Sequence, residues 1–482
     1  MKTRIFSFLA AAATALAALA ASAGAAPSLE VLPVGSVFYA GTPTQVCLRL
    51  KVTAKQGESL CSLQFSTADC TRLADLSGVH LYSSKQAPFF SPHCSDASLR
   101  ADKLASSNTA AAGTVYFNTT VNLQEGDNYL WLVYDLASTA RGNDLITAQC
   151  LSVTDGTGQL VQPTNSAPQS EAKVFPFKYR IAPYYRPKWI TTGWDGGLLN
   201  ATHFKYMTDF IFFGYSTSGT SIAAQWDASG DINTVALEKV KKWRGKSASG
   251  IILGLKNGGD LASVMADSAQ REELANNLVA CVKENDFQGV NIDWEYPKSA
   301  ANWRNLAYFL ASLREKLAGT GTTLSLAIDV NYDPPPAEVW DQADYLCMMT
   351  YDRPGQHSTM EHAKSDIAKT RGWGVPNPRI ILGLPFYSNE VDNPRNWDQQ
   401  KGYNYILRNF PTLSANVNTF RDPSSGKNHY FNGATLIKQK CKYAIQQKIG
   451  GVMIWCYDND VPLTNPRSLG KAMYSVIKQT KR

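Results

Sequence analysis

The second half of the chain alternates short apolar runs with segments of helical periodicity. A strand buried on both faces is nearly all apolar, as parallel sheets require. From about residue 178 there are eight such runs, each followed by a segment with apolar residues three or four positions apart. The expected strands are Arg180–Tyr185, Phe210–Gly214, Ile251–Leu255, Val290–Glu295, Leu324–Val330, Tyr345–Tyr351, Ile380–Phe386 and Gly451–Trp455. Eight strand–helix repeats predict an α/β fold, a TIM (β/α)8 barrel over 178–482, with its active site at the carboxyl ends of the strands.

Two of the intervening helices carry end signals. Asp267 and Gln270 are spaced as an N-terminal capping pair ahead of one apolar stripe. Gly319 follows the stripe of the next helix, where a left-handed residue commonly ends a helix.

The first half of the chain has a different pattern, in which short alternating runs are separated by Gly, Ser, Asn and Asp. This pattern predicts a small all-β domain, an antiparallel β-sandwich, over 27–170. Gly126–Asp135 is the clearest expected strand, and Thr164–Ser170 is expected to be a polar linker. Residues 1–26 are typical of a signal peptide, with Lys2 and Arg4 before an Ala/Leu run and Ala21–Ala23 as a cleavage site. We therefore expect a secreted, periplasmic or cell-surface protein with no membrane span after cleavage.

Charge and cysteine content narrow the classes of function. The net charge of +7 is not gathered in any basic run, so a nucleic-acid partner is not expected. The six histidines do not cluster and no cysteine spacing resembles a zinc site, so we expect no metal. Export permits disulfides, and one or two among the five early cysteines are expected, although the pairing is open.

The candidate chemistry lies in the expected strand Val290–Glu295. Because side chains alternate along a strand, Asn291, Asp293 and Glu295 share one face and the apolar residues between them share the other. Two neighbouring carboxyls repel each other, which can hold one proton near neutral pH, as acid/base sugar chemistry requires. The alternative is a hydrogen-bonded polar layer inside a barrel with no chemistry.

This half of the chain resembles glycoside hydrolase family 18, the chitinase and endo-β-N-acetylglucosaminidase family. The family's D-x-x-D-x-D-x-E strand appears as Gln288–Glu295, and its M-x-Y-D strand as Met349–Asp352. Gly383–Tyr387, Gly450–Trp455 and the pair Tyr184–Tyr185 resemble its seventh, eighth and first strands, in the right order.

The resemblance implies a substrate-assisted retaining mechanism. Glu295 would protonate the leaving oxygen while the 2-acetamido group of the sugar attacks its own anomeric carbon, giving an oxazolinium ion. Asp293 and Tyr351 would hold the acetamide, and Trp455 would lie under the sugar ring. Further positions implied to bind substrate are Tyr184, Asn291, Met349 and Asp352. No cofactor is needed, and the partner would be an N-acetylglucosamine-containing oligo- or polysaccharide bound by a monomer.

The first half resembles the sandwich that precedes sialidase catalytic domains in gut-dwelling bacteria, through Gly126–Asp135 and Ala140–Asn143. Carbohydrate binding and a structural spacer both stay open as its role.

Two motifs depart from the family pattern. Gln288 and Asn291 replace the first two aspartates of the catalytic strand, and Lys256–Gly259 stands where S-x-G-G is usual. The missing carboxylate at 291 is expected to lower the pKa of Asp293 and Glu295 and to shift the activity optimum toward acid.

The substrate stays open from sequence. Chitin-type β-1,4 polymers, the chitobiose core of N-glycans and mucin-type host glycans all offer the acetamide. A non-catalytic oligosaccharide-binding protein and a surface protein whose barrel only presents the sandwich are further alternatives. The segment between Tyr387 and Phe431 is expected to be too short for the extra α+β lobe of some relatives, which favours a shallow groove. Of its aromatic residues Trp397, Tyr403 and Tyr405, two are expected to be packing residues.

Overall fold

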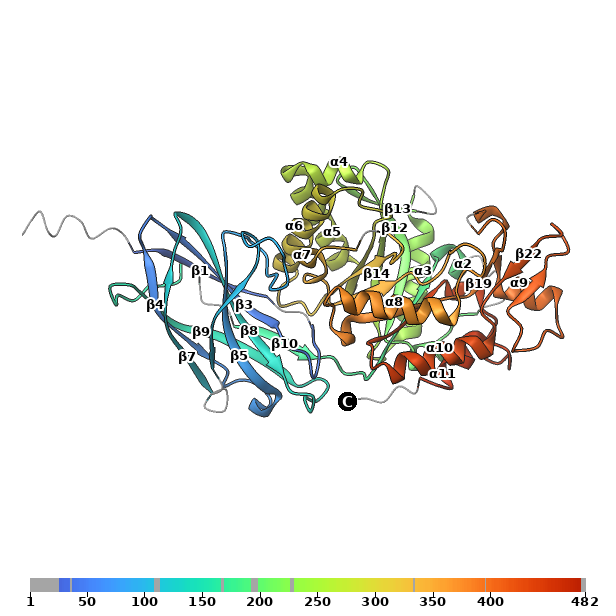
Figure 1. Cartoon of the computed structure of the whole chain (residues 1–482), viewed down its shortest axis with the longest axis horizontal. Coiled ribbons are helices and arrows are strands. Elements are labelled where there is room, and N and C mark those ends of the chain that lie inside the picture. Colours follow the sequence, from blue (N-terminus) through green and yellow to red (C-terminus); the bar gives the residue numbers. More distant parts are fainter. Residues whose placement is uncertain are drawn as a thin grey trace, which may run out of the picture.

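The computed structural model describes residues 26–34, 37–107, 113–165, 169–191, 198–225, 229–332, 334–394 and 396–477. The expected signal peptide, apart from residue 26, lies outside these residues. A sandwich and a barrel lie side by side (Figure 1). No helix in the described ranges is both long enough and apolar enough to cross a bilayer.

The N-terminal half is the expected β-sandwich, built from two five-stranded sheets. The first sheet has the order β1 (Ser28–Pro33), β3 (Gln45–Ala54), β8 (Gly126–Leu136), β5 (Leu76–Lys85), β6 (Asp102–Ser107). The second has the order β2 (Val37–Phe38), β10 (Ser170–Val174), β9 (Leu145–Asp155), β4 (Ser59–Ser66), β7 (Thr114–Asn122). Alternate side chains of both sheets form the core between them, as in other sandwiches.

The expected linker Thr164–Ser170 is bound to the sandwich where the structure describes it. The Asn165 side chain accepts from the Val31 amide at 3.0 Å and donates to the Val31 carbonyl at 2.7 Å, so it continues the sheet edge. Beyond it, β10 pairs with β9 and β2, which carries the sandwich to Val174.

The C-terminal half is the expected eight-stranded parallel barrel, and all eight predicted strands form. They are β11 (Arg180–Tyr185), β12 (Asp209–Ser218), β14 (Gly250–Lys256), β15 (Gly289–Asp293), β16 (Thr323–Ile328), β17 (Tyr345–Met348), β18 (Ile380–Pro385) and β23 (Gly451–Trp455). A short strand, β13 (Ser221–Ala224), extends β12 as a hairpin. The barrel closes because β11 pairs with both β23 and β12.

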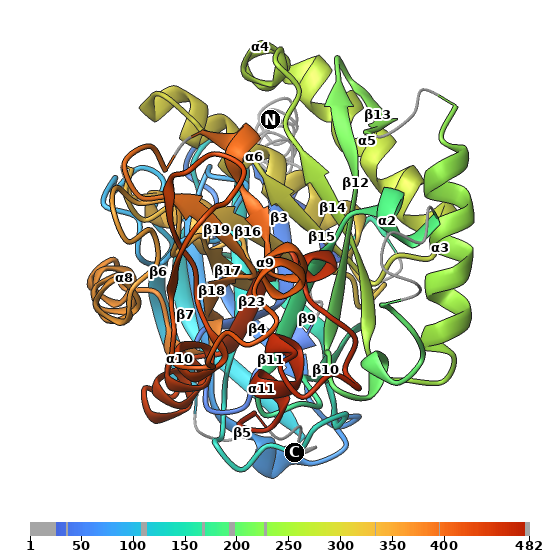
Figure 2. The ribbon, with the colours of Figure 1, turned by 90° about the vertical axis from the view of Figure 1, so that its right-hand side faces the viewer.

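Helices surround the strands (Figure 2). The predicted cap is present, since the Asp267 side chain accepts from the Gln270 amide at 2.9 Å at the start of α5. Gly319, with a φ of 73°, follows the end of α6 as expected. The described helices are α2 (Pro187–Thr191), α3 (Asp231–Arg244), α4 (Leu261–Ala266), α5 (Ser268–Glu284), α6 (Ala300–Lys316), α7 (Ala337–Trp340), α8 (Met360–Gly372), α9 (Tyr403–Asn409), α10 (Ala434–Gln446) and α11 (Leu469–Tyr474).

Strand alternation divides the barrel into two apolar regions. In β17, Leu346 and Met348 point outward into the large core shared with the helices. Tyr345 and Cys347 point inward, into a smaller cluster that fills the barrel. Both faces of each strand are therefore buried, which explains why the strands are nearly all apolar.

A compact insertion lies between β18 and α10, at the end of the molecule opposite the sandwich (Figure 1). It consists of α9 and a sheet with the order β20 (Lys401–Gly402), β19 (Tyr387–Glu390), β22 (Asn428–Tyr430), β21 (Thr419–Arg421). A small α+β unit thus forms in the segment that was expected to be too short for the extra α+β lobe of some relatives, because two- to four-residue strands suffice to build it.

The expected disulfides do not form, and all nine cysteines are free thiols. Cys47 and Cys150 are buried in the sandwich core, and Cys61 donates to the Asp155 carbonyl at 2.9 Å. Burial raises the pKa of the Cys150 thiol to about 12, which keeps it unreactive.

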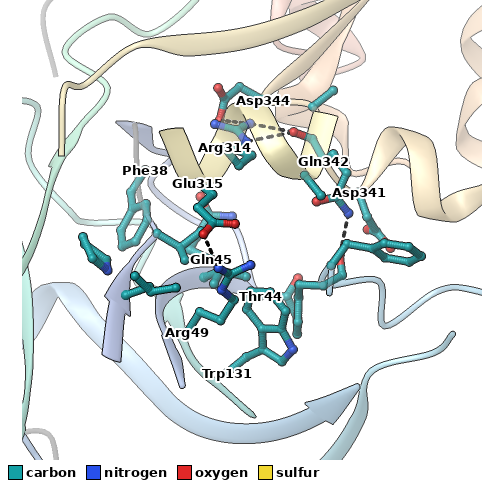
Figure 3. Close-up of a pocket in the computed structure, with 18 of the residues that line it drawn as sticks. Phe38, Thr44, Gln45, Arg49, Trp131, Arg314, Glu315, Asp341, Gln342 and Asp344 are labelled. Carbon is teal, nitrogen blue, oxygen red and sulfur yellow. Dashed lines mark hydrogen bonds and ion pairs between the residues drawn. The ribbon is translucent and has the colours of Figure 1, made fainter. Parts of the chain in front are cut away.

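The sandwich packs against the end of the barrel at which the strands begin (Figure 3). Arg49 of β3 forms an ion pair at 2.8 Å with Glu315 of α6. The Gln342 side chain donates to the Phe90 carbonyl at 2.8 Å, and the Ser91 hydroxyl donates to the Asp341 carboxylate at 2.7 Å. A cavity of only about 80 Å³ remains between these groups. The contact is close and polar, so the sandwich is not tethered by a linker alone.

Arg180, the first residue of β11, joins the two halves at the barrel axis. Its guanidinium is 1% exposed, forms an ion pair with Asp209 and donates to the Tyr39 hydroxyl of the sandwich at 2.6 Å. The Phe175 and Tyr345 rings lie 4.1 and 4.0 Å from it. Tyr39 thereby supplies an acceptor that a buried cation needs.

Replacing Tyr39 by Phe in the full chain should destabilise the barrel as well as the sandwich. It leaves one guanidinium N–H of Arg180 buried without an acceptor, at a cost of about 1–3 kcal/mol. Amide hydrogen exchange should rise in β11 and β23 together with the sandwich strands. Tyr116→Phe, at a hydroxyl on the exposed face of β7, is the matched control and should change little. Unchanged exchange in the barrel strands of Tyr39→Phe would show that the halves are energetically independent.

Candidate active site

The carboxyl ends of the barrel strands surround a cavity of about 540 Å³. Its position is the one expected for the active site of a TIM barrel. Its walls are formed by Tyr184, Lys256, Asp293, Glu295, Tyr296, Ala327, Asp329, Tyr332, Met349, Tyr351, Asp352, Trp397, Gln400 and Trp455. Every residue predicted for the site lines this cavity except Asn291.

Asp293 and Glu295 lie at the end of β15, which stops at Asp293, two residues earlier than expected. Beyond the end of the strand, Asn257 forms hydrogen bonds to the backbone of both residues. Its amide donates to the Asp293 carbonyl at 3.1 Å, and its side-chain oxygen accepts from the Glu295 amide at 2.9 Å. Asp293 is 5% exposed, whereas Glu295 keeps an exposed surface. The two carboxyls therefore differ in solvent access although they are two residues apart.

The environment favours the protonated form of both carboxyls. Burial raises the pKa of Asp293 to about 8, the negative charge of Glu295 adds to the rise, and Lys256 opposes it. The pKa of Glu295 is also raised, chiefly because the cavity wall displaces water, with Lys256 again opposing. The Asp293 Oδ1 atom has no hydrogen-bond partner in the described part of the chain. The pair can therefore hold a proton near neutral pH and still offer a free acceptor.

Asn291 points into the barrel below the cavity and is fully buried. Its Oδ1 accepts from the Tyr184 hydroxyl at 2.6 Å, and its Nδ2 donates to the Ser325 hydroxyl at 2.9 Å. It makes no hydrogen bond to Asp293. Burial holds the pKa of Asp293 well above its ordinary value without a carboxylate at 291.

The other departure, Gln288, lies at the opposite end of the barrel. It precedes β15, where its side-chain oxygen accepts from Arg244 at 2.6 Å and from the Ile251 amide at 3.0 Å. Of the two substitutions in the catalytic strand, the one at 291 is near enough to the cavity to influence it directly.

Tyr351 and Asp352 follow β17, which ends at Met348 rather than at Tyr351 as expected. The Tyr351 ring is 5% exposed, and its hydroxyl has only a weak contact, 3.9 Å to the Met453 sulfur. Asp352 has a φ of 60°, a left-handed conformation that aspartate tolerates better than most residues. The structure therefore leaves the Tyr351 hydroxyl without a strong partner on the cavity wall.

Two residues of the insertion hold Asp352, a contact that the sequence did not predict. The Tyr387 hydroxyl and the Asn389 side chain each donate to the Asp352 Oδ1 atom at 2.6 Å. Tyr387 belongs to a motif that the sequence already singled out, but nothing in the sequence indicates its partner. The insertion therefore positions the wall of the cavity as well as covering its rim.

Aromatic rings form the floor and the two sides of the cavity. Trp455, at the end of β23, makes edge contacts with Tyr184 and Phe213 at ring distances of 5.5 and 5.1 Å. Tyr332 is 44% exposed and stacks on Tyr296 at 4.3 Å. Sequence reasoning missed this stacked pair.

The three aromatics of the insertion divide as predicted. Tyr403 is 3% exposed and donates to the Arg467 carbonyl, and Tyr405 donates to Asp422 at 2.8 Å. Trp397 is 55% exposed and lines the cavity. Two are packing residues and the third lies where a sugar could stack.

Asp329, after β16, is a further carboxyl that sequence reasoning missed. It lines the catalytic cavity and a second cavity of about 380 Å³ that Glu295 also lines, and burial raises its pKa. A polar residue at the carboxyl end of a barrel strand was the available signal. Among the described residues, no group of three or more His, Cys, Asp or Glu side chains is placed to hold a metal ion.

The structure is a closed parallel barrel with a cavity at the carboxyl ends of its strands. An acidic pair and an aromatic floor line this cavity, as in barrel glycoside hydrolases. A family model described as glycosyl hydrolases family 18 matches residues 181–460. Because this match covers more than half of the 482 residues, the chain belongs to that family. A second model, the N-terminal domain of BNR-repeat neuraminidase, matches residues 39–157 and confirms the sialidase-type resemblance of the sandwich.

Individual relatives are distant. Chitinase 1 of Aphanocladium album is 26% identical over 244 residues, which are 39% of this chain and 56% of that protein. Probable chitinase 2 of Drosophila melanogaster is 22% identical over 262 residues, 42% of this chain and 54% of that protein. The chain thus spans about half the length of these curated relatives.

Solved structures support the fold. A chitinase from Bacteroides thetaiotaomicron matches with a TM-score of 0.54 and 20% identity, over 62% of this chain and 97% of that one. A Group IV chitinase of Ostrinia furnacalis in complex with allosamidin gives a TM-score of 0.52 and 16% identity, over 62% and 98%. At these identities the likeness shows a common fold.

Asp293→Asn should stabilise the protein against heat in a pH-dependent way. Between the unfolded pKa of about 4 and the folded value of about 8, the folded chain holds a proton that the unfolded chain releases. The stability of the wild type therefore falls as pH rises through this window, and a neutral amide avoids the loss. At pH 8 the variant should unfold a few degrees higher, at about 2–4 °C per kcal/mol, and near pH 4 the difference should shrink.

The control for this experiment is Asp392→Asn, at an exposed carboxyl of the insertion, which should show no such trend. A difference in unfolding temperature between Asp293→Asn and wild type that is constant from pH 4 to pH 8 would contradict a raised pKa for Asp293.

Proposed function

We propose that the protein is an endo-acting glycoside hydrolase that cleaves β-1,4-linked N-acetylglucosamine bonds by a substrate-assisted retaining mechanism. The observation that carries the proposal is the pair Asp293 and Glu295, both biased toward protonation, beside an unpartnered Asp293 oxygen and a weakly bonded Tyr351 hydroxyl. Buried polar groups without partners are uncommon and need an explanation. A bound acetamide group supplies both missing partners.

Glu295 is the general acid. It keeps an exposed surface in the cavity and a raised pKa, so it retains its proton to higher pH than an ordinary glutamate and can deliver it to the glycosidic oxygen. The C–O bond breaks as the acetamide oxygen of the same sugar bonds to the anomeric carbon, which gives an oxazolinium ion. Water then opens this ion and returns a proton to Glu295, so the configuration is retained.

Asp293 and Tyr351 orient the acetamide. The free Asp293 Oδ1 accepts a hydrogen bond from the acetamide N–H, and this bond turns the acetamide oxygen toward the anomeric carbon. Once the Asp293 carboxyl is ionised, its negative charge stabilises the cationic ring. The Tyr351 hydroxyl donates to the acetamide oxygen. Trp455 lies beneath the sugar ring, with Met349 and Asp352 beside it and Tyr184 and Asn291 supporting the floor from below.

The shape of the cavity favours attack within a chain of sugars. Two exposed aromatic rings line it, Trp397 on the insertion and Tyr332 after β16. Rings at such positions can stack on sugars, so two or more residues of a polymer can bind at once. The distant relatives bear the names of chitinases, which favours a chitin-type substrate.

The chitobiose core of N-glycans, or a mucin-type host glycan, is the second candidate substrate. It offers the same acetamide, and the neuraminidase-type sandwich favours it. A purely oligosaccharide-binding protein is disfavoured because the acid Glu295 is retained. Export after cleavage within residues 1–26 is also proposed, on the charged start and the Ala/Leu run.

The test is product analysis by mass spectrometry for the wild type and Glu295→Gln. Both are incubated with a mixture of chitohexaose and a high-mannose glycoprotein. Shorter chito-oligomers would identify a chitinase, whereas released glycans with one reducing N-acetylglucosamine would identify an N-glycan endo-enzyme. Glu295→Gln should lose on the order of 10²–10⁴-fold in kcat, because general acid catalysis is removed. No product from wild type with either substrate would contradict the proposal.

Asn291→Asp should extend activity to higher pH. The added carboxylate lies two residues before Asp293, on the same face of β15. Its negative charge should raise the pKa of Asp293 and Glu295, so the alkaline limb of the pH–rate profile should rise or flatten. The Tyr184 and Ser325 hydroxyls that now bind the amide can both donate to a carboxylate, so the fold should be kept. A profile identical to wild type would contradict this expectation.

A further inference from the structure

Lys256 brings a positive charge to the catalytic cavity. It is the last residue of β14, lies opposite Asp293 in the pairing of β14 with β15, and lines the cavity with an exposed side chain. It is the only cationic side chain among the described residues that line this cavity. No hydrogen bond or ion pair within the described ranges engages its ammonium group, so the charge is not committed elsewhere.

The charges around Lys256 are mainly negative. Asp293 and Glu295 follow β15, Asp329 follows β16 and Asp352 follows β17. Asp260, after β14 itself, is held by the Gly219 amide at 2.8 Å. The part of β12 that pairs with Lys256 contributes the uncharged Ser216. The titratable hydroxyls on the cavity wall are those of Tyr184, Tyr296, Tyr332 and Tyr351.

Four carboxyls around one cavity repel one another when ionised, and water is partly excluded from them. A fixed positive charge is the simplest way to limit this repulsion. Arg353, the nearest arginine in the chain to Asp352, forms an ion pair with Asp366 of α8 and does not line the cavity. Lys256 is therefore placed to balance the negative charge of the catalytic carboxyls. The uncharged Asn291 adds no further negative charge to be balanced.

We propose that Lys256 is a positioning residue of the active site, whose ammonium group balances the charge of Asp293 and Glu295 and thereby sets the pH range of activity. The inference rests on the proposed function and goes beyond it by assigning a charge-balancing role to the cavity lysine. Lys256 takes no part in bond making, because it acts through the two carboxyls. The same charge opposes the rise in the pKa of both groups.

The sign of the effect follows from electrostatics. A nearby cation stabilises the carboxylate form, so the pair releases its protons at lower pH with Lys256 present than without it. Removing the charge should move both limbs of the pH–rate profile upward. Retaining the charge on a different side chain should leave the profile close to wild type.

The experiment compares Lys256→Met, Lys256→Arg and Lys298→Met in the full chain. Lys298 is exposed and lies three residues after Glu295. Lys298→Met therefore removes a nearby positive charge from a side chain that does not line the catalytic cavity. Titration of the side-chain carboxyls by ¹³C NMR gives the apparent pKa values of the pair without substrate, with Asp293→Asn and Glu295→Gln samples identifying the signals. The pH–rate profile on the substrate that the product analysis identifies is measured in parallel.

Lys256→Met should raise the apparent pKa values by about 0.5–1 unit and shift both limbs of the profile by a similar amount. Lys256→Arg should restore wild-type values, and Lys298→Met should not change them. Unchanged titration in Lys256→Met, or an equal shift in Lys256→Arg, would overturn the role of the charge. A wild type that cleaves no glycan would contradict the proposed function, and the NMR titration would still decide whether Lys256 balances the pair.

Discussion

Closure of the parallel barrel is the constraint on which the rest of the structure depends. Once β11 pairs with both β23 and β12, all eight strands run in one direction and their carboxyl ends form one rim. Each strand must then alternate between the helix layer and the barrel interior. Residues as distant in sequence as Tyr184, Asp293 and Trp455 meet at the rim for this reason.

The buried ionisable groups at the two ends of the barrel differ in their partners. At the end where the strands begin, Arg180 is enclosed by an ion pair, a hydrogen bond from the sandwich and two aromatic rings. At the rim, Asp293 is almost as deeply buried, yet one of its oxygens has no partner in the described residues. The Asp209 carboxylate pairs with the Arg180 charge at the junction of the two halves, whereas burial raises the pKa of Asp293 at the rim, which is typical of a functional site. The end of the barrel with Arg180 thus contributes to stability, and the rim with Asp293 carries the candidate chemistry.

The insertion and the loop after β14 adapt this common arrangement. Tyr387 and Asn389 of the insertion fix Asp352, and Trp397 extends the cavity over the rim. Asn257 continues the hydrogen bonding where β15 ends, and Lys256 beside it carries the cavity's positive charge. Each of these residues lies at or beyond the carboxyl end of a barrel strand, where the chain can change without disturbing the barrel.

The sequence alone determined the two halves, the eight strands and the pair Asp293 and Glu295, because burial on both faces and strand alternation are local patterns. The resemblance to the family's motifs added Tyr351 and Trp455. Only the tertiary structure decided that Gln288 lies at the far end from the cavity while Asn291 lies beneath it, since strand register sets depth along the barrel. It likewise decided that the nine cysteines are free thiols, that Asp329 and the Tyr296–Tyr332 stack join the site, and that burial holds the pKa of Asp293 well above its ordinary value. Desolvation and contacts between distant segments are properties of the folded chain, and no local pattern encodes them.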